Sequence, residues 1–96
     1  MNQYILELKR VATDFFKSDE VKIVLFGSRA RKDSHTSSDV DIGIIPYGRF
    51  DEKRITLFRE KLEDSNIPYG VDVVNLSEVS EELREQALKE AVLWKE

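Results

Sequence analysis

Residues 21–45 read VKIVLFGSRARKDSHTSSDVDIGII, and this stretch decides the fold. Its first six residues are apolar apart from Lys22 and rich in β-branched side chains, which predicts a mostly buried strand ending at Gly27. The residues that follow are small, polar and typical of turns, so we expect a loop. From Asp39 to Ile45, Val and Ile alternate with Asp and Gly, which predicts a second strand with one buried face.

Helical patterns flank these two strands. Apolar residues recur with helical spacing over about residues 2–18 and again over about 51–64, where Asp51 can cap the helix. A third strand is expected at 71–76, and a last helix is expected to begin at residue 77 or 80 and to include the apolar residues up to Trp94. Helices alternating with short strands predict an α/β fold, a sheet layered with helices.

Length and composition exclude several classes of protein. The 96 residues are enough for one domain, 1–96, and a composition with 41% hydrophobic residues, 4 Gly and 2 Pro excludes collagen-like and disordered chains. Fifteen basic against 19 acidic residues argue against a general nucleic-acid binder. The N-terminus does not resemble a signal peptide, and no apolar run reaches the roughly 18 residues of a membrane span. We therefore expect a cytoplasmic protein that does not enter a membrane.

Three aspartates stand in or beside the predicted strands. Asp39 and Asp41 are two residues apart, so their side chains leave the same face of a strand, and Asp72 is the one acid in an apolar run. Carboxylates so placed repel one another, and Mg²⁺ or Mn²⁺ relieves that repulsion. An Asp-x-Asp pair alone commonly caps a turn or pairs with Arg. The third acid, and the absence of a basic residue within either strand, favour a metal site.

The turn after the first strand carries the second chemical signal. Gly27 lets the backbone approach a ligand, and the Ser28 hydroxyl with the amides that follow it can bind phosphate oxygens. Arg29 and Arg31 are either phosphate clamps or surface charges, and Arg29 is the first choice because it is nearer Ser28. A Gly-Ser turn alone is weak evidence, but beside a carboxylate metal site it suits a nucleoside triphosphate bound with Mg²⁺.

The stretch GSRARKDSHTSSDVD resembles the signature of the DNA polymerase β-like nucleotidyltransferase superfamily, a Gly-Ser pair, a ten-residue gap and Asp-x-Asp. Within it, GSRAR followed by SDVDIGI resembles the minimal nucleotidyltransferases, single catalytic cores encoded beside a HEPN-domain partner. The resemblance covers about residues 20–76 and implies a polymerase β palm-like core, a small mixed β-sheet packed with helices. Lys32 stands where many relatives have glycine, which affects the expected shape of that loop.

The resemblance also implies roles for individual residues. The Gly-Ser pair, helped by Arg29, would bind the triphosphate of ATP. The three aspartates would be catalytic, with the first two ligating both of two Mg²⁺ or Mn²⁺ ions and the third binding the ion that activates the acceptor hydroxyl. The implied site residues are Gly27, Ser28, Arg29, Asp39, Asp41 and Asp72. The enzyme would transfer a nucleoside monophosphate, with AMP expected, to a hydroxyl of a HEPN toxin, and so act as its antitoxin.

A second hypothesis is a binding module, an antitoxin that blocks its partner by contact while its nucleotidyl site is idle. The intact set of acids favours the enzyme. The last helix has more apolar residues than one core-facing stripe needs; it either covers the sheet only, or offers Leu88, Val92, Leu93 and Trp94 to a partner or a second copy of the chain. The acceptor, the base preference, the number of transfers and the oligomeric state stay open at this point.

Overall fold

The computed structural model of the chain describes residues 3–27 and 39–96. The elements in chain order are α1 (Gln3–Phe15), β1 (Val21–Phe26), β2 (Val40–Pro46), α3 (Lys53–Glu63), β3 (Val71–Asn75), α4 (Glu81–Lys89) and β4 (Val92–Lys95). The first five lie within a few residues of their predicted bounds. Within the described ranges, no helix combines the length and the apolar character that crossing a bilayer requires.

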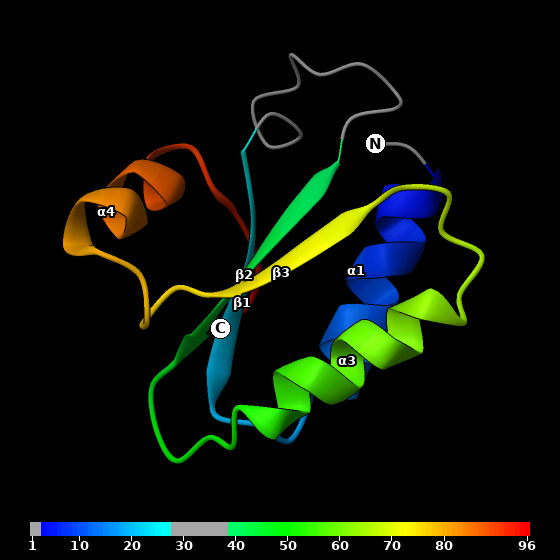
Figure 1. The fold of residues 1–96 in the computed structure, drawn as a ribbon, viewed down its shortest axis with the longest axis horizontal. Coiled ribbons are helices and arrows are strands. Elements are labelled where there is room, and N and C mark those ends of the chain that lie inside the picture. Colours follow the sequence, from blue (N-terminus) through cyan, green and yellow to red (C-terminus); the bar gives the residue numbers. More distant parts are fainter. Residues whose placement is uncertain (1–2, 28–38) are drawn as a thin grey trace.

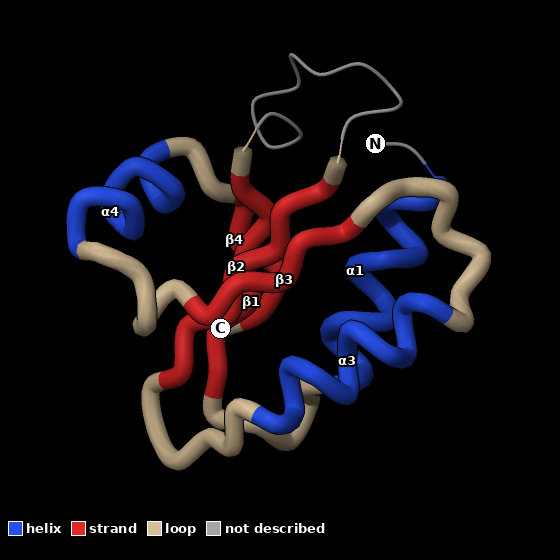
Figure 2. The backbone as a smooth tube through the Cα atoms, viewed as in Figure 1, coloured by secondary structure: helices blue, strands red, loops and turns tan. Residues whose placement is uncertain are grey.

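Four strands form one mixed sheet in the order β3-β2-β1-β4. Strand β2 is antiparallel to β1 and parallel to β3, and β4 is antiparallel to the other side of β1. Figures 1 and 2 show α1 and α3 next to each other on one side of the sheet and α4 on the opposite side. The predicted α/β fold, a small mixed sheet packed with helices, is confirmed.

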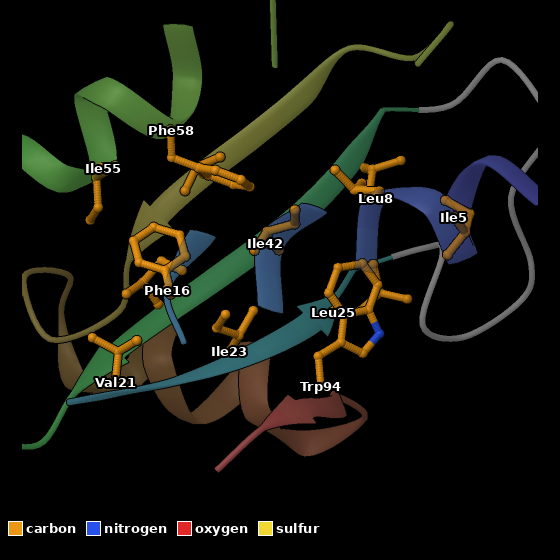
Figure 3. Packing of buried hydrophobic residues seen from close by; sticks show 14 residues of the cluster. Ile5, Leu8, Phe16, Val21, Ile23, Leu25, Ile42, Ile55, Phe58 and Trp94 are labelled. Carbon is orange, nitrogen blue, oxygen red and sulfur yellow. The ribbon is translucent and has the colours of Figure 1, made fainter. Parts of the chain in front are cut away.

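The main hydrophobic core lies between the sheet and the pair α1 and α3. Phe16 and Phe58 meet there with ring centroids 5.0 Å apart, and Leu8 of α1 belongs to the same cluster (Figure 3). Alternate residues of β2 form the sheet side of this core, since Val40, Ile42 and Ile44 are fully buried. The residues between them must therefore point to the α4 side of the sheet.

A smaller apolar layer lies on the α4 side, around Gly43. A Cβ atom at this glycine would overlap Leu76 Cδ1 and lie 2.9 Å from Val24 Cγ2, so the two side chains close over the backbone of β2. Val24 and Leu76 are 4% and 1% exposed. The absence of a side chain at Gly43 thus lets this layer pack directly beside the acids of the same strand.

The prediction of a last helix that includes Trp94 is wrong. Helix α4 begins after Ser80, whose hydroxyl accepts a hydrogen bond from the Leu83 N–H, and it ends at Lys89. The apolar residues that follow become β4, because pairing with β1 satisfies backbone groups that an edge strand would otherwise leave open. A short apolar run fits a helix or a strand equally well by periodicity.

The correction moves Trp94 from a partner surface into the core. Its side chain is 7% exposed and packs in the same cluster as Leu25 and Ile5 (Figure 3), whereas Leu88, Val92 and Leu93 are 39%, 36% and 48% exposed. Only these three of the four residues remain available to another chain.

We expect Trp94→Ala to lower the free energy of unfolding by about 3–5 kcal/mol, because it removes a large buried ring and leaves a cavity. Leu93→Ala is the matched control, since its side chain is 48% exposed, and it should cost less than about 1 kcal/mol. Urea unfolding measures both. Equal small losses would mean that Trp94 lies on the surface.

Candidate active site

Asp41 on β2 and Asp72 on β3 are direct partners in the parallel pairing of the two strands. Their side chains therefore leave the same face of the sheet, and it is the α4 face because Val40 and Ile42 on either side of Asp41 point into the main core. The sequence predicts this placement. The chemical roles of the two residues stay predictions.

Asp39 lies one residue before β2 and packs against the backbone of Gly70. The Val40 N–H donates to the Gly70 carbonyl at 2.9 Å, which joins the two segments where β2 and β3 begin. A Cβ atom at Gly70 would lie 2.7 Å from Asp39 Oδ1, so a side chain there would displace the carboxylate. Sequence reasoning missed Gly70, although a glycine two residues before Asp72 was a usable signal.

Gly27 follows β1 and contacts Asp41 directly. Its φ is +77°, a value that residues other than glycine rarely adopt. A Cβ atom there would overlap Asp41 Oδ2 and lie 3.3 Å from Asp41 Cγ. The predicted close backbone approach at Gly27 is thus made, in this structure, to a carboxylate. Ser28 and Arg29 lie outside the described residues.

The acids influence one another electrostatically. The pKa of Asp41 is raised above its usual value, first because burial disfavours the charged carboxylate, then because the negative charges of Asp72 and Asp39 repel it. A divalent cation with oxygen ligands would oppose all three effects, so the donor set fits Mg²⁺ or Mn²⁺. Within residues 3–27 and 39–96, however, no three acidic or histidine side chains are already grouped so that they could hold an ion. Binding would have to draw the carboxylates together.

An open cleft of about 500 Å³ lies against two of the acids. Asp41 and Asp72 line it together with apolar side chains that include Leu83 of α4. Arg59 of α3 also lines the cleft, and sequence reasoning missed it because an arginine on an exposed helix face gives no signal of its own. The cleft can therefore accept a ligand that has both apolar and charged parts.

Residues 10–96 match the model of one protein family, described as polymerase beta nucleotidyltransferase. The chain belongs to this nucleotidyltransferase family. The resemblance inferred from the Gly-Ser and Asp-x-Asp signature is thereby confirmed, and the chain is a nucleotidyltransferase. No curated protein matches it significantly.

Solved structures show the same nucleotidyltransferase fold. One assigned as a minimal nucleotidyltransferase is 26% identical and has a TM-score of 0.69. The match covers 96% of this chain and 95% of that chain. A chain of a toxin–antitoxin complex with AMP-PNP is 24% identical, with a TM-score of 0.70 over 90% of this chain and 71% of its own. A chain of the complex of tri-AMPylated Shewanella oneidensis HEPN toxin with MNT antitoxin is 22% identical, with a TM-score of 0.65. The match covers 95% of this chain and 68% of that chain.

Of the predicted site residues of this nucleotidyltransferase, the structure brings four into one region. Asp41 is at its centre, with Gly27 in contact, Asp72 beside it in the sheet, and Asp39 near enough to raise its pKa. They come from the end of β1 and the beginnings of β2 and β3. These termini coincide because β1 is antiparallel to β2 and β3 is parallel to it.

Proposed function

We propose that this nucleotidyltransferase transfers AMP from ATP to a hydroxyl group of a partner protein in a reaction that needs divalent cations. One observation carries the proposal. Asp41 and Asp72 are register partners on one face of the sheet, and the backbone of Gly27 packs against Asp41. This arrangement places two acids and a glycine turn around a single point, as the two-metal chemistry of nucleotidyl transfer requires.

Each residue has a task in this proposal. Asp39 and Asp41 would hold both ions, and Asp72 would hold the one on the acceptor side. The ions, when bound, neutralise charge on the triphosphate and lower the pKa of the attacking hydroxyl. Gly27 lets the turn after β1 approach Asp41 closely, and Ser28 and Arg29 would bind the triphosphate oxygens.

The acceptor is proposed to be a HEPN-domain toxin, which the transfer would neutralise in the cytoplasm. The similarity of the fold to antitoxin chains in complexes with AMP-PNP and with a tri-AMPylated HEPN toxin supports this choice. The cleft is open, so a side chain of a docked protein could reach the acids. Leu88, Val92 and Leu93 are exposed apolar residues that such a partner could cover.

The test is to incubate the purified protein with ATP, Mg²⁺ and the product of the adjacent gene, the proposed HEPN partner, and then to weigh that product by mass spectrometry. We expect a gain of one or more AMP units that EDTA abolishes. Loss of toxin activity without any gain in mass would contradict the proposal and support an antitoxin that acts by contact alone.

A further inference from the structure

Strand β3 lies at an edge of the sheet, and alternate residues of it turn their backbone groups away from β2. The Gly70 carbonyl accepts a hydrogen bond from β2 and the Leu76 N–H donates one to β2, each at 2.9 Å. Along a parallel strand, the residues that bond to one neighbour alternate with residues that face the other side. The backbone groups of Val71 and Val73 therefore face the open edge.

One of these edge groups already has a partner from outside the sheet. Arg59 of α3 donates from Nη2 to the Val73 carbonyl at 2.6 Å, so a donor beside β3 can reach the edge. Within residues 3–27 and 39–96, no hydrogen bond engages the Val71 N–H, the Val71 carbonyl or the Val73 N–H. A peptide in extended conformation can supply partners for these groups, as a further strand would.

Space beside this edge is present on both faces of the sheet. The cleft of about 500 Å³ that contains Asp72 lies on the α4 face. A second hollow, of about 390 Å³, is lined by residues of α3 and by Ile67 and Tyr69. The cleft and the hollow share Val71 and Arg59, so they meet at the edge of β3.

The alternation of side chains along a strand determines what an added peptide would offer to each space. Side chains at paired positions of neighbouring strands leave the same face of the sheet. The peptide side chain beside Asp72 would therefore enter the cleft, and the side chains before and after it would point to the hollow. Ile67 and Tyr69 are half-buried there and offer apolar surface. A residue with a hydroxyl, flanked by apolar residues, fits both spaces.

We propose that the edge of β3 binds an extended segment of the acceptor protein as an added strand, with the hydroxyl that receives AMP beside Asp72 and an apolar side chain on either side of it. This inference rests on the proposed function. The hydroxyl oxygen attacks the α-phosphorus of ATP, and a new O–P bond forms. The bond from that phosphorus to the bridging oxygen breaks, pyrophosphate leaves with the electron pair, and the hydroxyl proton passes to water.

The first test measures amide hydrogen exchange by NMR in the whole protein, alone and saturated with the product of the adjacent gene. We expect binding to slow exchange at Val71 and Val73 by about tenfold or more, because their N–H groups gain hydrogen bonds. The amides of Asp72 and Val74 face β2 and should change less. Unchanged exchange at Val71 and Val73 in the complex, or slowing confined to β4 at the other edge, would overturn the inference.

The second test removes one donor from the edge. Val71→Pro deletes an N–H that does not bond to β2, and proline is tolerated at such positions of edge strands. Its affinity for the same gene product and its rate of transfer should fall roughly tenfold or more, with the loss of hydrogen bonds to the added strand. Titration calorimetry should show that it still binds α,β-methylene-ATP with Mg²⁺ as the wild type does.

Glu81→Pro is the control for the introduction of proline. Glu81 is the exposed first residue of α4, a position that proline favours, and this variant should bind the gene product like the wild type. Wild-type affinity in Val71→Pro would contradict the added strand. If Val71→Pro fails to bind the ATP analogue, its fold is disturbed and the exchange measurement decides.

Failure of the proposed function gives a different result. If the gene product binds the wild type but gains no AMP, the proposed function falls, and exchange at Val71 and Val73 still reports where the product binds. If it gains AMP while neither amide is slowed and Val71→Pro binds it normally, only the added strand falls.

Discussion

Asp41→Asn is expected to lower the rate of nucleotidyl transfer by about 10³-fold, because it removes the carboxylate that would ligate both metal ions and with it several kcal/mol of transition-state stabilisation. The rate is measured as AMP incorporated into the proposed HEPN partner. Asp64→Asn is the control, since Asp64 is an exposed aspartate after α3 that does not line the cleft, and it should transfer AMP at the wild-type rate.

The same variant should not lose stability. Burial and the neighbouring acids raise the pKa of Asp41, so the folded wild type carries an electrostatic cost while this carboxylate is ionised. In EDTA at pH 7 we expect Asp41→Asn to melt at the same temperature as the wild type or higher. Mg²⁺ with ATP should raise its melting temperature much less, because the gain in stability follows the affinity for the ligand.

The pH dependence has a definite sign. The folded state holds the Asp41 proton more tightly than the unfolded state, so the wild type gains stability as the pH falls through the raised pKa and loses it as the pH rises. Any advantage of Asp41→Asn in EDTA should therefore shrink toward low pH. A variant that melts well below the wild type at pH 7, or still transfers AMP at a near-normal rate, would show that Asp41 serves the fold.

Gly27→Ala should lower transfer by about 10²-fold, the effect of a displacement of roughly 1 Å in a reacting site. The new Cβ atom would overlap Asp41 Oδ2, and the φ of +77° would strain any side chain, at a cost of about 1–2 kcal/mol in stability. Activity is measured by AMP incorporation and stability by thermal melting. Either the Asp41 carboxylate or the Gly27 turn must move, and either movement separates the acids from the turn proposed to bind the triphosphate.

Two other glycines calibrate this prediction. At Gly48 a Cβ atom would meet the carboxylate end of Glu20, a flexible side chain that can move away, so Gly48→Ala should leave transfer unchanged. At Gly70 it would meet Asp39 Oδ1, so Gly70→Ala should cause an intermediate loss. Equal activity in the Gly27 and Gly48 variants would mean that the contact with Asp41 is not needed for catalysis.

The sequence was sufficient for those parts of the fold that follow from local alternation. Val40, Ile42 and Ile44 alternate with polar or small residues, and a strand with one buried face is the only simple reading of that pattern. Asp72, the one acid in an apolar run, stood out as a third candidate site residue, and the parallel pairing of β3 with β2 places it beside Asp41. The first prediction uses only the side-chain period of two, and the second uses only the cost of a lone charge among apolar residues.

The missed features depend on tertiary contacts. The apolar residues around Trp94 are too few to show a period, and pairing with β1 decides their conformation. Arg59 contacts the Val73 carbonyl across fourteen residues of sequence, and no local pattern predicts such a contact. Gly70 matters only because the parallel pairing brings Asp39 against it.

The two strands that carry Asp41 and Asp72 differ in their number of hydrogen-bonded neighbours, and we expect the backbone of β2 to be more rigid than that of β3. Strand β2 has hydrogen-bonded neighbours on both sides, whereas β3 is at the sheet edge and has one. Amides of β3 should accordingly exchange with solvent sooner than those of β2, because edge segments open at lower free energy. If the two aspartates hold an ion as proposed, Asp41 would be the more rigid ligand and Asp72 the ligand whose position adjusts when the ion binds.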